Sequence, residues 1–226
     1  MDLTKEQIIE VLRHADAVCL DVDSTLCPDE GIDELAKFHG VGDEVIELTN
    51  KAMGGSMTFQ EALRERIKII NPTYIRLKTF LQQRTPIATP GAKELIDKLR
   101  ERGCYIYLIS GGFTEIINPT AKMIGIPRED ILANKFLYYY TGQCVSADES
   151  LPTCRSGGKA KAIEELRKKH GYKKIVMIGD GATDLEACPP ADAFIGFGAN
   201  VVREVVKEKA NWFVYSFQEI LDELKD

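Results

Sequence analysis

Two aspartates stand one residue apart at the end of an apolar segment. Residues 17–20 are apolar, and Asp21 and Asp23 follow at once. Because residues i and i+2 of a strand share a face, the two carboxylates are predicted to point the same way. Like charges held this close repel each other unless a cation or a shared proton relieves them. The pair therefore predicts magnesium binding and phosphoryl chemistry, although a strand ending in a polar turn is the alternative.

Two later segments could bind an anion. The apolar run 104–109 leads into Ser110, Gly111 and Gly112. A hydroxyl and two unhindered amides at the carboxyl end of a strand can hold phosphate oxygens. The alternative is that these residues form an ordinary glycine-rich turn. Lys159 opens a predicted helix, where a cation opposes the helix dipole. Either an anion lies near this lysine or the side chain lies on the surface.

A second acidic cluster follows the apolar segment 175–178. It contains Asp180 and Asp184. Glycines on both sides of Asp180 would let a ligand approach the backbone closely. Magnesium prefers hard oxygen ligands, so two or three aspartates and a phosphate oxygen would suit it. The cluster therefore favours metal binding over a turn without function.

Composition limits the possible partners and compartment. The 226 residues carry a net charge of 29 − 35 = −6, which argues against nucleic acid or an anionic membrane as the main partner. A small anionic substrate remains possible, because a pocket can be locally positive. The six cysteines form no C-x-x-C pair, which argues against zinc and redox sites. With no secretory signal and no apolar run of membrane-spanning length, a cytoplasmic protein is expected.

Short apolar segments alternate with helical patterns along the chain. This alternation predicts an α/β fold with a Rossmann-like, doubly wound parallel sheet. A hairpin is expected at 137–145, and Thr89-Pro90 is expected to begin a helix as N-cap and first residue. The predicted strands are 16–22, 104–110, 174–179 and 193–197.

Residues 30–86 interrupt this alternation with helical patterns and no convincing strand. They predict a small all-helical cap inserted after the first strand, with residues 1–29 and 87–226 forming the core. An insertion at this point lies over the ligand-binding edge of an open α/β sheet, so it could act as a lid. The alternative is that it only adds core.

The motifs, taken in order, resemble the haloacid dehalogenase superfamily. They are Asp21-Val22-Asp23-Ser24-Thr25, Ser110-Gly111-Gly112, Lys159 and Gly179-Asp180-Gly181-Ala182-Thr183-Asp184. Longer segments, including 30–36, 52–55 and 186–198, are similar to its phosphoserine phosphatase family. The resemblance covers nearly the whole chain. It implies a Mg2+-dependent phosphatase that converts O-phospho-L-serine to L-serine and phosphate, the last step of L-serine biosynthesis. It also implies a homodimer.

The resemblance implies catalytic roles for the first motif. Asp21 would attack phosphorus and become an aspartyl-phosphate. Asp23 would protonate the departing serine oxygen and later take a proton from water. The Asp21 carboxylate, the Asp23 carbonyl and Asp180 would hold magnesium, with Asp184 supporting them.

The resemblance also implies the residues that bind substrate. Glu30 would bind its ammonium group and Arg66 its carboxylate, with Arg64 as a competitor for the second role. Thr183 stands where many members have Asn, so the resemblance does not specify the hydrogen bond that Thr183 makes. Ser110, Gly111, Gly112 and Lys159 would bind the phosphoryl oxygens, and Met53 and Gly54 would close over the substrate.

Two other activities fit the same residues. A phosphotransferase would pass the aspartyl-phosphate to another hydroxyl acceptor, and a related phosphatase would act on other small phosphomonoesters. A non-catalytic phosphate sensor is a third possibility. It would not need both Asp21 and Asp23.

Overall fold

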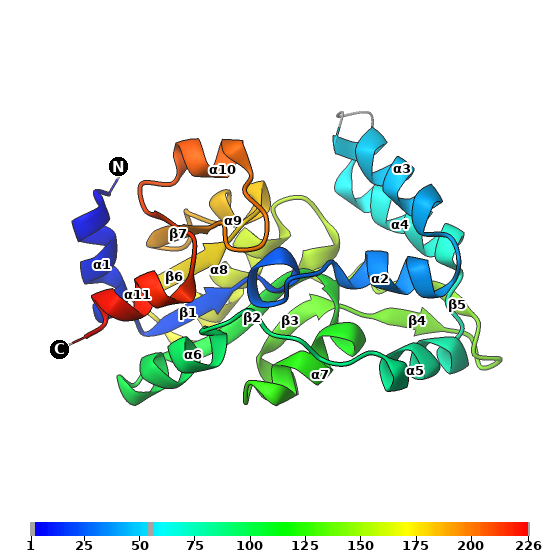
Figure 1. Ribbon diagram of the computed structural model, residues 1–226, viewed down its shortest axis with the longest axis horizontal. Helices are drawn as coiled ribbons and strands as arrows, with labels where there is room; N and C mark the ends of the chain where they lie inside the picture. The colour runs from blue at the N-terminus through cyan, green and yellow to red at the C-terminus, as the bar shows by residue number, and fades with distance from the viewer. Residues whose placement is uncertain (1–2, 54–56, 226) are drawn as a thin grey trace.

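A parallel sheet forms the centre of the molecule (Figure 1). The computed structural model describes residues 3–53 and 57–225, and within these ranges six strands form this sheet in the order β3-β2-β1-β6-β7-β8. All neighbouring strands in it are parallel, which confirms the predicted Rossmann-like α/β core. The strands are β1 (Ala17–Leu20), β2 (Tyr105–Phe113), β3 (Ile131–Asn134), β6 (Ile175–Gly179), β7 (Ala193–Phe197) and β8 (Phe213–Val214).

Helices cover both faces of the sheet, which is why its strands are apolar throughout. Alternate residues of β1 enter different cores: Val18 and Leu20 pack with α1, α6, α7 and α11, whereas Ala17 and Cys19 pack with α8 and α10. These helices are α1 (Lys5–Arg13), α6 (Ala92–Glu101), α7 (Thr114–Met123), α8 (Gly158–His170), α10 (Glu204–Lys209) and α11 (Phe217–Glu223). The short helix α9 (Ala182–Leu185) follows β6.

In the described part of the chain, four helices lie between β1 and α6, as the helical patterns of residues 30–86 predict. They are α2 (Gly31–Phe38), α3 (Gly42–Met53), α4 (Phe59–Ile70) and α5 (Tyr74–Gln83), and they lie far from both termini (Figure 1). A capping box of Thr58 and Glu61 begins α4. A hairpin of β4 (Phe136–Tyr138) and β5 (Cys144–Ala147) packs against this helix group, with Phe136 and Ala147 in the same apolar cluster as Leu63.

Several predicted boundaries are wrong. The first strand ends at Leu20, and residues Val22–Leu26 form a turn, η1, in which the Cys27 amide donates to the Val22 carbonyl and Ser24 has a φ of 59°. The second strand continues to Phe113, through the serine-glycine motif. Thr89 does not cap a helix: α6 begins at Ala92, and the Thr89 hydroxyl donates to the Thr25 carbonyl at 2.7 Å. Strands β3 and β8 were not predicted, because each is too short for a clear pattern.

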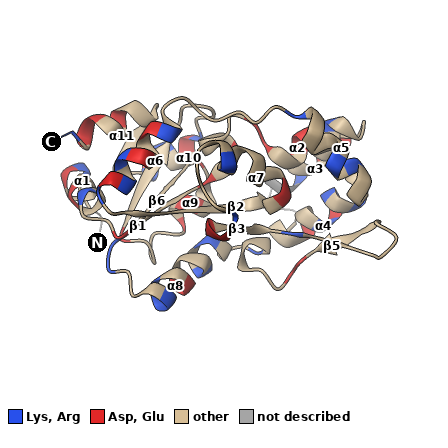
Figure 2. Ribbon diagram, turned by 90° about the horizontal axis from the view of Figure 1, so that it is seen from below, with Lys and Arg blue, Asp and Glu red and all other residues tan. Residues whose placement is uncertain are grey.

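The surface helices carry charges of both signs (Figure 2). Lys93 pairs with Asp97 along α6, and Lys161 pairs with Glu164 along α8. Such exposed pairs contribute little to stability. Within the described ranges, no helix combines the length and apolarity needed to cross a membrane.

Candidate active site

Three aspartates meet beyond the carboxyl ends of β1 and β6. The strand order reverses between these two neighbouring strands: β2 and β3 lie on one side, and β7 and β8 lie on the other. Asp21 directly follows β1, Asp180 directly follows the neighbouring β6, and Asp184 lies in α9. Their carboxylates each offer an oxygen within 4.8 Å of the others, and all three residues are buried. Ligands of open α/β sheets bind at such a point, beyond the carboxyl ends of the strands. The structure therefore brings the two acidic motifs of the sequence into one cluster.

Lys159 lies inside this cluster and not on the surface. Its Nζ is 2.7 Å from Asp21 Oδ1 and 2.6 Å from Asp184 Oδ1. A turn with Gly157 in the left-handed region precedes α8, and a Cβ on Gly158 would lie 2.0 Å from the Pro152 carbonyl oxygen. Only glycine at 158 lets the helix begin so close to the preceding segment. The lysine that opposes the dipole of α8 is thus compensated by two buried carboxylates.

The cluster is short of positive charge. Burial raises the pKa of Asp180 and raises that of Asp184 well above its usual value, and the negative charge of Asp21 adds to both shifts. Burial alone would lower the pKa of Lys159, but Asp184 and Asp21 outweigh it and raise this pKa. Clustered carboxylate oxygens are ligands that suit a divalent cation such as Mg2+. The residues present therefore fit a bound metal.

Asp23 reaches the same site by way of the η1 turn and not by strand alternation. Its Oδ1 accepts the Gly31 amide at 2.8 Å, and its Oδ2 accepts the Ser110 hydroxyl at 3.3 Å. Burial raises the pKa of Asp23 to about 7, and the charges of Glu30 and Asp21 add to this effect. Asp23 can therefore hold a proton near neutral pH.

The end of β2 forms the wall beside Asp23. Ser110 is fully buried, and its hydroxyl oxygen accepts the Gly112 amide at 2.9 Å. A Cβ on Gly112 would lie 2.6 Å from Asp23 Oδ2, and one on Gly111 would lie 2.9 Å from the Phe59 ring. Both positions thus require glycine if Asp23 and Phe59 are to stay where they are.

Glu30 joins the site through two partners that the sequence did not indicate. Its Oε1 accepts the Ser24 hydroxyl at 2.7 Å and lies 3.5 Å from Arg203 Nη2. Arg203 also donates to Asp180 Oδ2 at 2.7 Å, and Thr25 donates to Asp180 Oδ1 at 3.0 Å. The one available signal for Arg203 was its place beyond the carboxyl end of an apolar strand segment, the same signal that selected Asp21 and Asp180.

The predicted substrate residues of the helical segment are less tightly joined to the cluster. Arg66, in α4, donates to the Thr49 hydroxyl at 3.1 Å, and its buried Nε has no hydrogen-bond partner in the described part of the chain. No hydrogen bond between described residues joins it to Glu30. Arg64 points elsewhere and pairs with Glu149, so it does not compete for the role predicted for Arg66.

Three further predictions remain open. Thr183 is half-buried in α9 between Asp180 and Asp184, and its predicted contact with substrate stays a prediction. Met53 is the last residue of α3, but its side chain and the whole of Gly54 lie outside the described residues.

Comparison with known proteins assigns the chain to a family. The profile of the haloacid dehalogenase-like hydrolases matches residues 15–192. A phosphoserine phosphatase of Rattus norvegicus is 50% identical over 224 residues, which cover 99% of this chain and 100% of that protein. The chain belongs to the phosphoserine phosphatase family of haloacid dehalogenase-like hydrolases. The resemblance noted in its motifs is thereby confirmed.

Solved structures agree with this family assignment. The structure of a phospho-aspartyl intermediate analogue of a phosphoserine phosphatase has a TM-score of 0.78 and 29% identity to this chain. The match covers 93% of this chain and 99% of that chain. The DsGPDH structure of Dunaliella salina has a TM-score of 0.87 and 36% identity. The match covers 99% of this chain but 38% of the Dunaliella chain. The fold of this family member therefore also occurs as part of a longer protein.

Proposed function

We propose that this protein hydrolyses O-phospho-L-serine to L-serine and phosphate, as the last step of L-serine biosynthesis. The observation that carries the proposal is the buried contact of Lys159 with Asp21 and Asp184, beside Asp23. This arrangement supports roles for Asp21 as nucleophile, Lys159 as the cation and Asp23 as proton donor within one site. Family relatives with the same overall length are phosphoserine phosphatases.

Asp21 is the nucleophile of the proposed reaction. One of its carboxylate oxygens forms a bond to phosphorus while the bond from phosphorus to the serine oxygen breaks. Asp23 gives its proton to that serine oxygen. In the second step Asp23 takes a proton from water as the water oxygen attacks phosphorus, which releases phosphate and restores the Asp21 carboxylate. A pKa of about 7 lets Asp23 serve as acid and then as base.

The phosphoryl group is bound by side chains and amides around Asp21. Lys159 supplies positive charge, and Ser110 with the amides of Gly111 and Gly112 supplies hydrogen-bond donors. Thr183, which lies in α9 between Asp180 and Asp184 in the sequence, is the further contact proposed for this group. Because the transferred group carries its charge on three oxygens, donors placed around it stabilise the transition state.

Magnesium is the proposed metal. The carboxylates of Asp21 and Asp180 and the carbonyl of Asp23 would hold it, with Asp184 beside them. When bound, it would neutralise charge on the phosphoryl oxygens. The support for this proposal is the buried acidic triad and its shortage of positive charge.

Removal of the metal is expected to abolish turnover. Treatment with a chelator should reduce phosphate release to background, and added Mg2+ should restore it, because three carboxylates would otherwise face the incoming anion. Zn2+ and Ca2+ serve as comparison metals in the same assay. Full activity after exhaustive chelation would contradict the role given to Asp180.

The helices of residues 30–86 are proposed to form the lid that recognises the amino-acid part of the substrate. Glu30 would bind the ammonium group and Arg66 the carboxylate, with Met53 and Gly54 above them. The buried Nε of Arg66, which has no partner among the described residues, is a donor ready for such a carboxylate. Arg can bind a carboxylate through two parallel hydrogen bonds.

A panel of phosphomonoesters tests the proposed substrate. With Mg2+ present, O-phospho-L-serine should give a kcat/KM about tenfold or more above that of O-phosphoethanolamine, which lacks the carboxylate, and of sugar phosphates, which lack both charged groups. The measurement is initial rates of phosphate release under matched conditions. Equal or faster turnover of the sugar phosphates would remove the substrate assignment.

The remaining proposals concern the cell and the assembly. We propose a cytoplasmic homodimer that acts on this small substrate and has neither nucleic acid nor membrane as a partner. The net charge of −6 supports the exclusion of polyanions, and the six unpaired cysteines suit a reducing compartment.

A further inference from the structure

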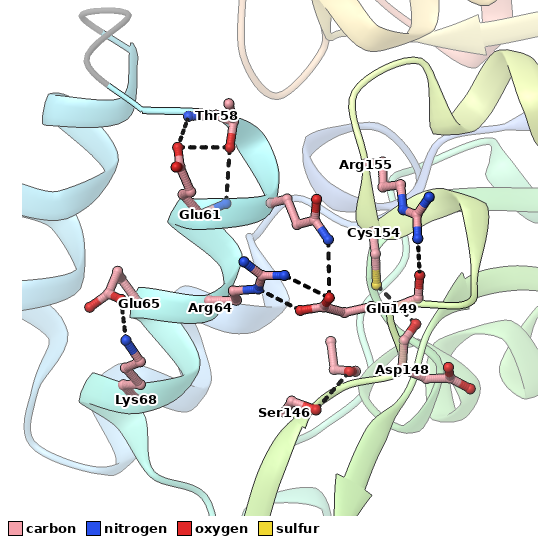
Figure 3. Close-up of polar contacts among 12 residues, drawn as sticks. Thr58, Glu61, Arg64, Glu65, Lys68, Ser146, Asp148, Glu149, Cys154 and Arg155 are labelled. Carbon is pink, nitrogen blue, oxygen red and sulfur yellow. Dashed lines mark hydrogen bonds and ion pairs between the residues drawn. The ribbon is translucent and has the colours of Figure 1, made fainter.

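Helix α4 presents two arginines in different directions. Consecutive helical residues are about 100° apart, so Arg64 and Arg66 project from the helix about 200° apart. Arg66 is half-buried and contacts Thr49 of α3, whereas Arg64 extends away from α3 to another part of the chain (Figure 3). Any rotation or sliding of α4 would therefore move Arg66 relative to the acidic cluster.

Arg64 is held by Glu149, which lies in the segment between β5 and α8 (Figure 3). Arg64 Nε lies 2.5 Å from Glu149 Oε1, and its Nη2 lies 2.7 Å from Oε2. Gln60, one helical turn earlier, donates to the same Oε2 at 3.2 Å. Arg155 in turn donates to the Glu149 carbonyl at 2.9 Å. Glu149 is thus fixed at both its side chain and its backbone.

This contact links the two charged ends of the proposed substrate site. The segment that carries Glu149 continues through η3 (Pro152–Cys154) into α8, where Lys159 contacts Asp21. The helix that Arg64 holds carries Arg66. The Arg64–Glu149 ion pair therefore joins the helix that carries Arg66, proposed for the substrate carboxylate, to the segment that leads to Lys159, proposed for the phosphate.

Apolar packing constrains the position and orientation of α4 less than the Arg64–Glu149 ion pair does. Leu63 and Ile67 share a cluster with Ala147 and Cys154, but apolar contacts are not directional. A guanidinium that binds both oxygens of one carboxylate is directional and fixes orientation as well as distance. The two side chains are partly exposed, at 49% and 34%, so the pair should add little to global stability.

We propose that Arg64 and Glu149 form a clasp that positions Arg66 for the substrate carboxylate. The clasp fixes the position of α4 relative to the segment that leads to Lys159. Both members act through Arg66 and touch no reacting atom, so they are positioning residues. The proposal rests on the proposed function, because it assumes a substrate that carries a carboxylate.

Neutral variants of the clasp give the kinetic test. Arg64→Gln and Glu149→Gln should each raise the KM for O-phospho-L-serine roughly threefold to tenfold and leave kcat nearly unchanged. The KM for O-phosphoethanolamine, which offers no carboxylate to Arg66, should stay the same. The exchanged pair, Arg64→Glu with Glu149→Arg, should recover part of the loss. An unchanged KM for O-phospho-L-serine, or an equal rise for both substrates, would overturn the proposal.

The same helix offers a matched control. Lys68 follows Arg64 by one helical turn and forms an exposed ion pair with Glu65, which points away from Glu149 (Figure 3). Lys68→Gln breaks an ion pair of the same helix without touching the clasp, and it should change neither KM. A rise in KM equal to that of Arg64→Gln would show a general charge effect and would also overturn the proposal.

Hydrogen exchange tests the clasp without any substrate. Amides of residues 59–70 should exchange faster in Arg64→Gln and in Glu149→Gln than in Lys68→Gln or the unaltered protein. Unchanged exchange there contradicts the clasp itself, whichever substrate the enzyme prefers. Failure of the unaltered enzyme to hydrolyse O-phospho-L-serine would instead remove the proposed function, so the two failures are distinguishable.

Discussion

Replacing Lys159 with alanine is expected to lower the free energy of unfolding by about 3–5 kcal/mol and to abolish turnover. The side chain is 9% exposed and contacts Asp21 and Asp184, so its removal leaves buried carboxylates without their nearest cation. Thermal unfolding in the presence of a chelator should show a fall in Tm of roughly 10 °C. Phosphate release measures the loss of activity.

The instability of this variant should depend on pH. The pKa of Asp184 is already raised well above its usual value by burial and by Asp21, and removing Lys159 raises it further. A carboxylate whose folded pKa is raised stabilises the fold fully below its unfolded pKa and loses that contribution as pH rises through the folded pKa. The deficit relative to the unaltered protein should therefore be smaller at pH 5 than at pH 8. Added Mg2+ should reduce it at pH 8.

A neighbouring lysine provides the control for this experiment. Lys161 lies in the same helix and forms an exposed pair with Glu164 at 3.5 Å. Lys161→Ala removes the same side chain and the same charge, but no buried carboxylate depends on it. Its Tm and activity should match those of the unaltered protein. A Lys159→Ala variant with the same deficit, relative to the unaltered protein, at pH 5 and at pH 8 would contradict the account of the buried cluster.

Asp21→Asn is expected to reduce kcat by a factor on the order of 10⁴ or more. The amide has nearly the shape of the carboxylate but is not a nucleophile, so no aspartyl-phosphate can form. Rapid quenching of the unaltered enzyme with substrate, followed by mass spectrometry of its peptides, should find a phosphoryl group on residue 21. The variant should show none.

The matched control is the same substitution at an exposed aspartate. Asp43 lies on the surface in the first turn of α3, and Asp43→Asn should leave kcat unchanged. Substantial turnover by Asp21→Asn would exclude the covalent mechanism, even if the substrate assignment held. A phosphoryl group found on another residue would assign the nucleophile to that residue instead.

Motifs at the ends of apolar segments could be recognised from the chain alone. Asp21, Ser110 and Asp180 each follow such a segment, and the carboxyl ends of parallel strands meet at one edge of a sheet. Their placement at one edge of the sheet therefore followed from the fold class. The capping box at Thr58 was equally readable, because its hydrogen bonds are local.

Contacts between distant segments could not be read in this way. Arg203 joins Asp180 and Glu30 because β7 lies beside β6, and strand order is a property of the assembled sheet. The orientation of Asp23 depends on the η1 turn, where Ser24 takes a left-handed conformation that a strand pattern does not indicate. The ion pair of Arg64 with Glu149 is likewise a contact between distant segments that no local pattern indicates. Local sequence thus specified the reactive groups, whereas long-range packing set their partners and charge balance, since both depend on side chains far apart in the chain.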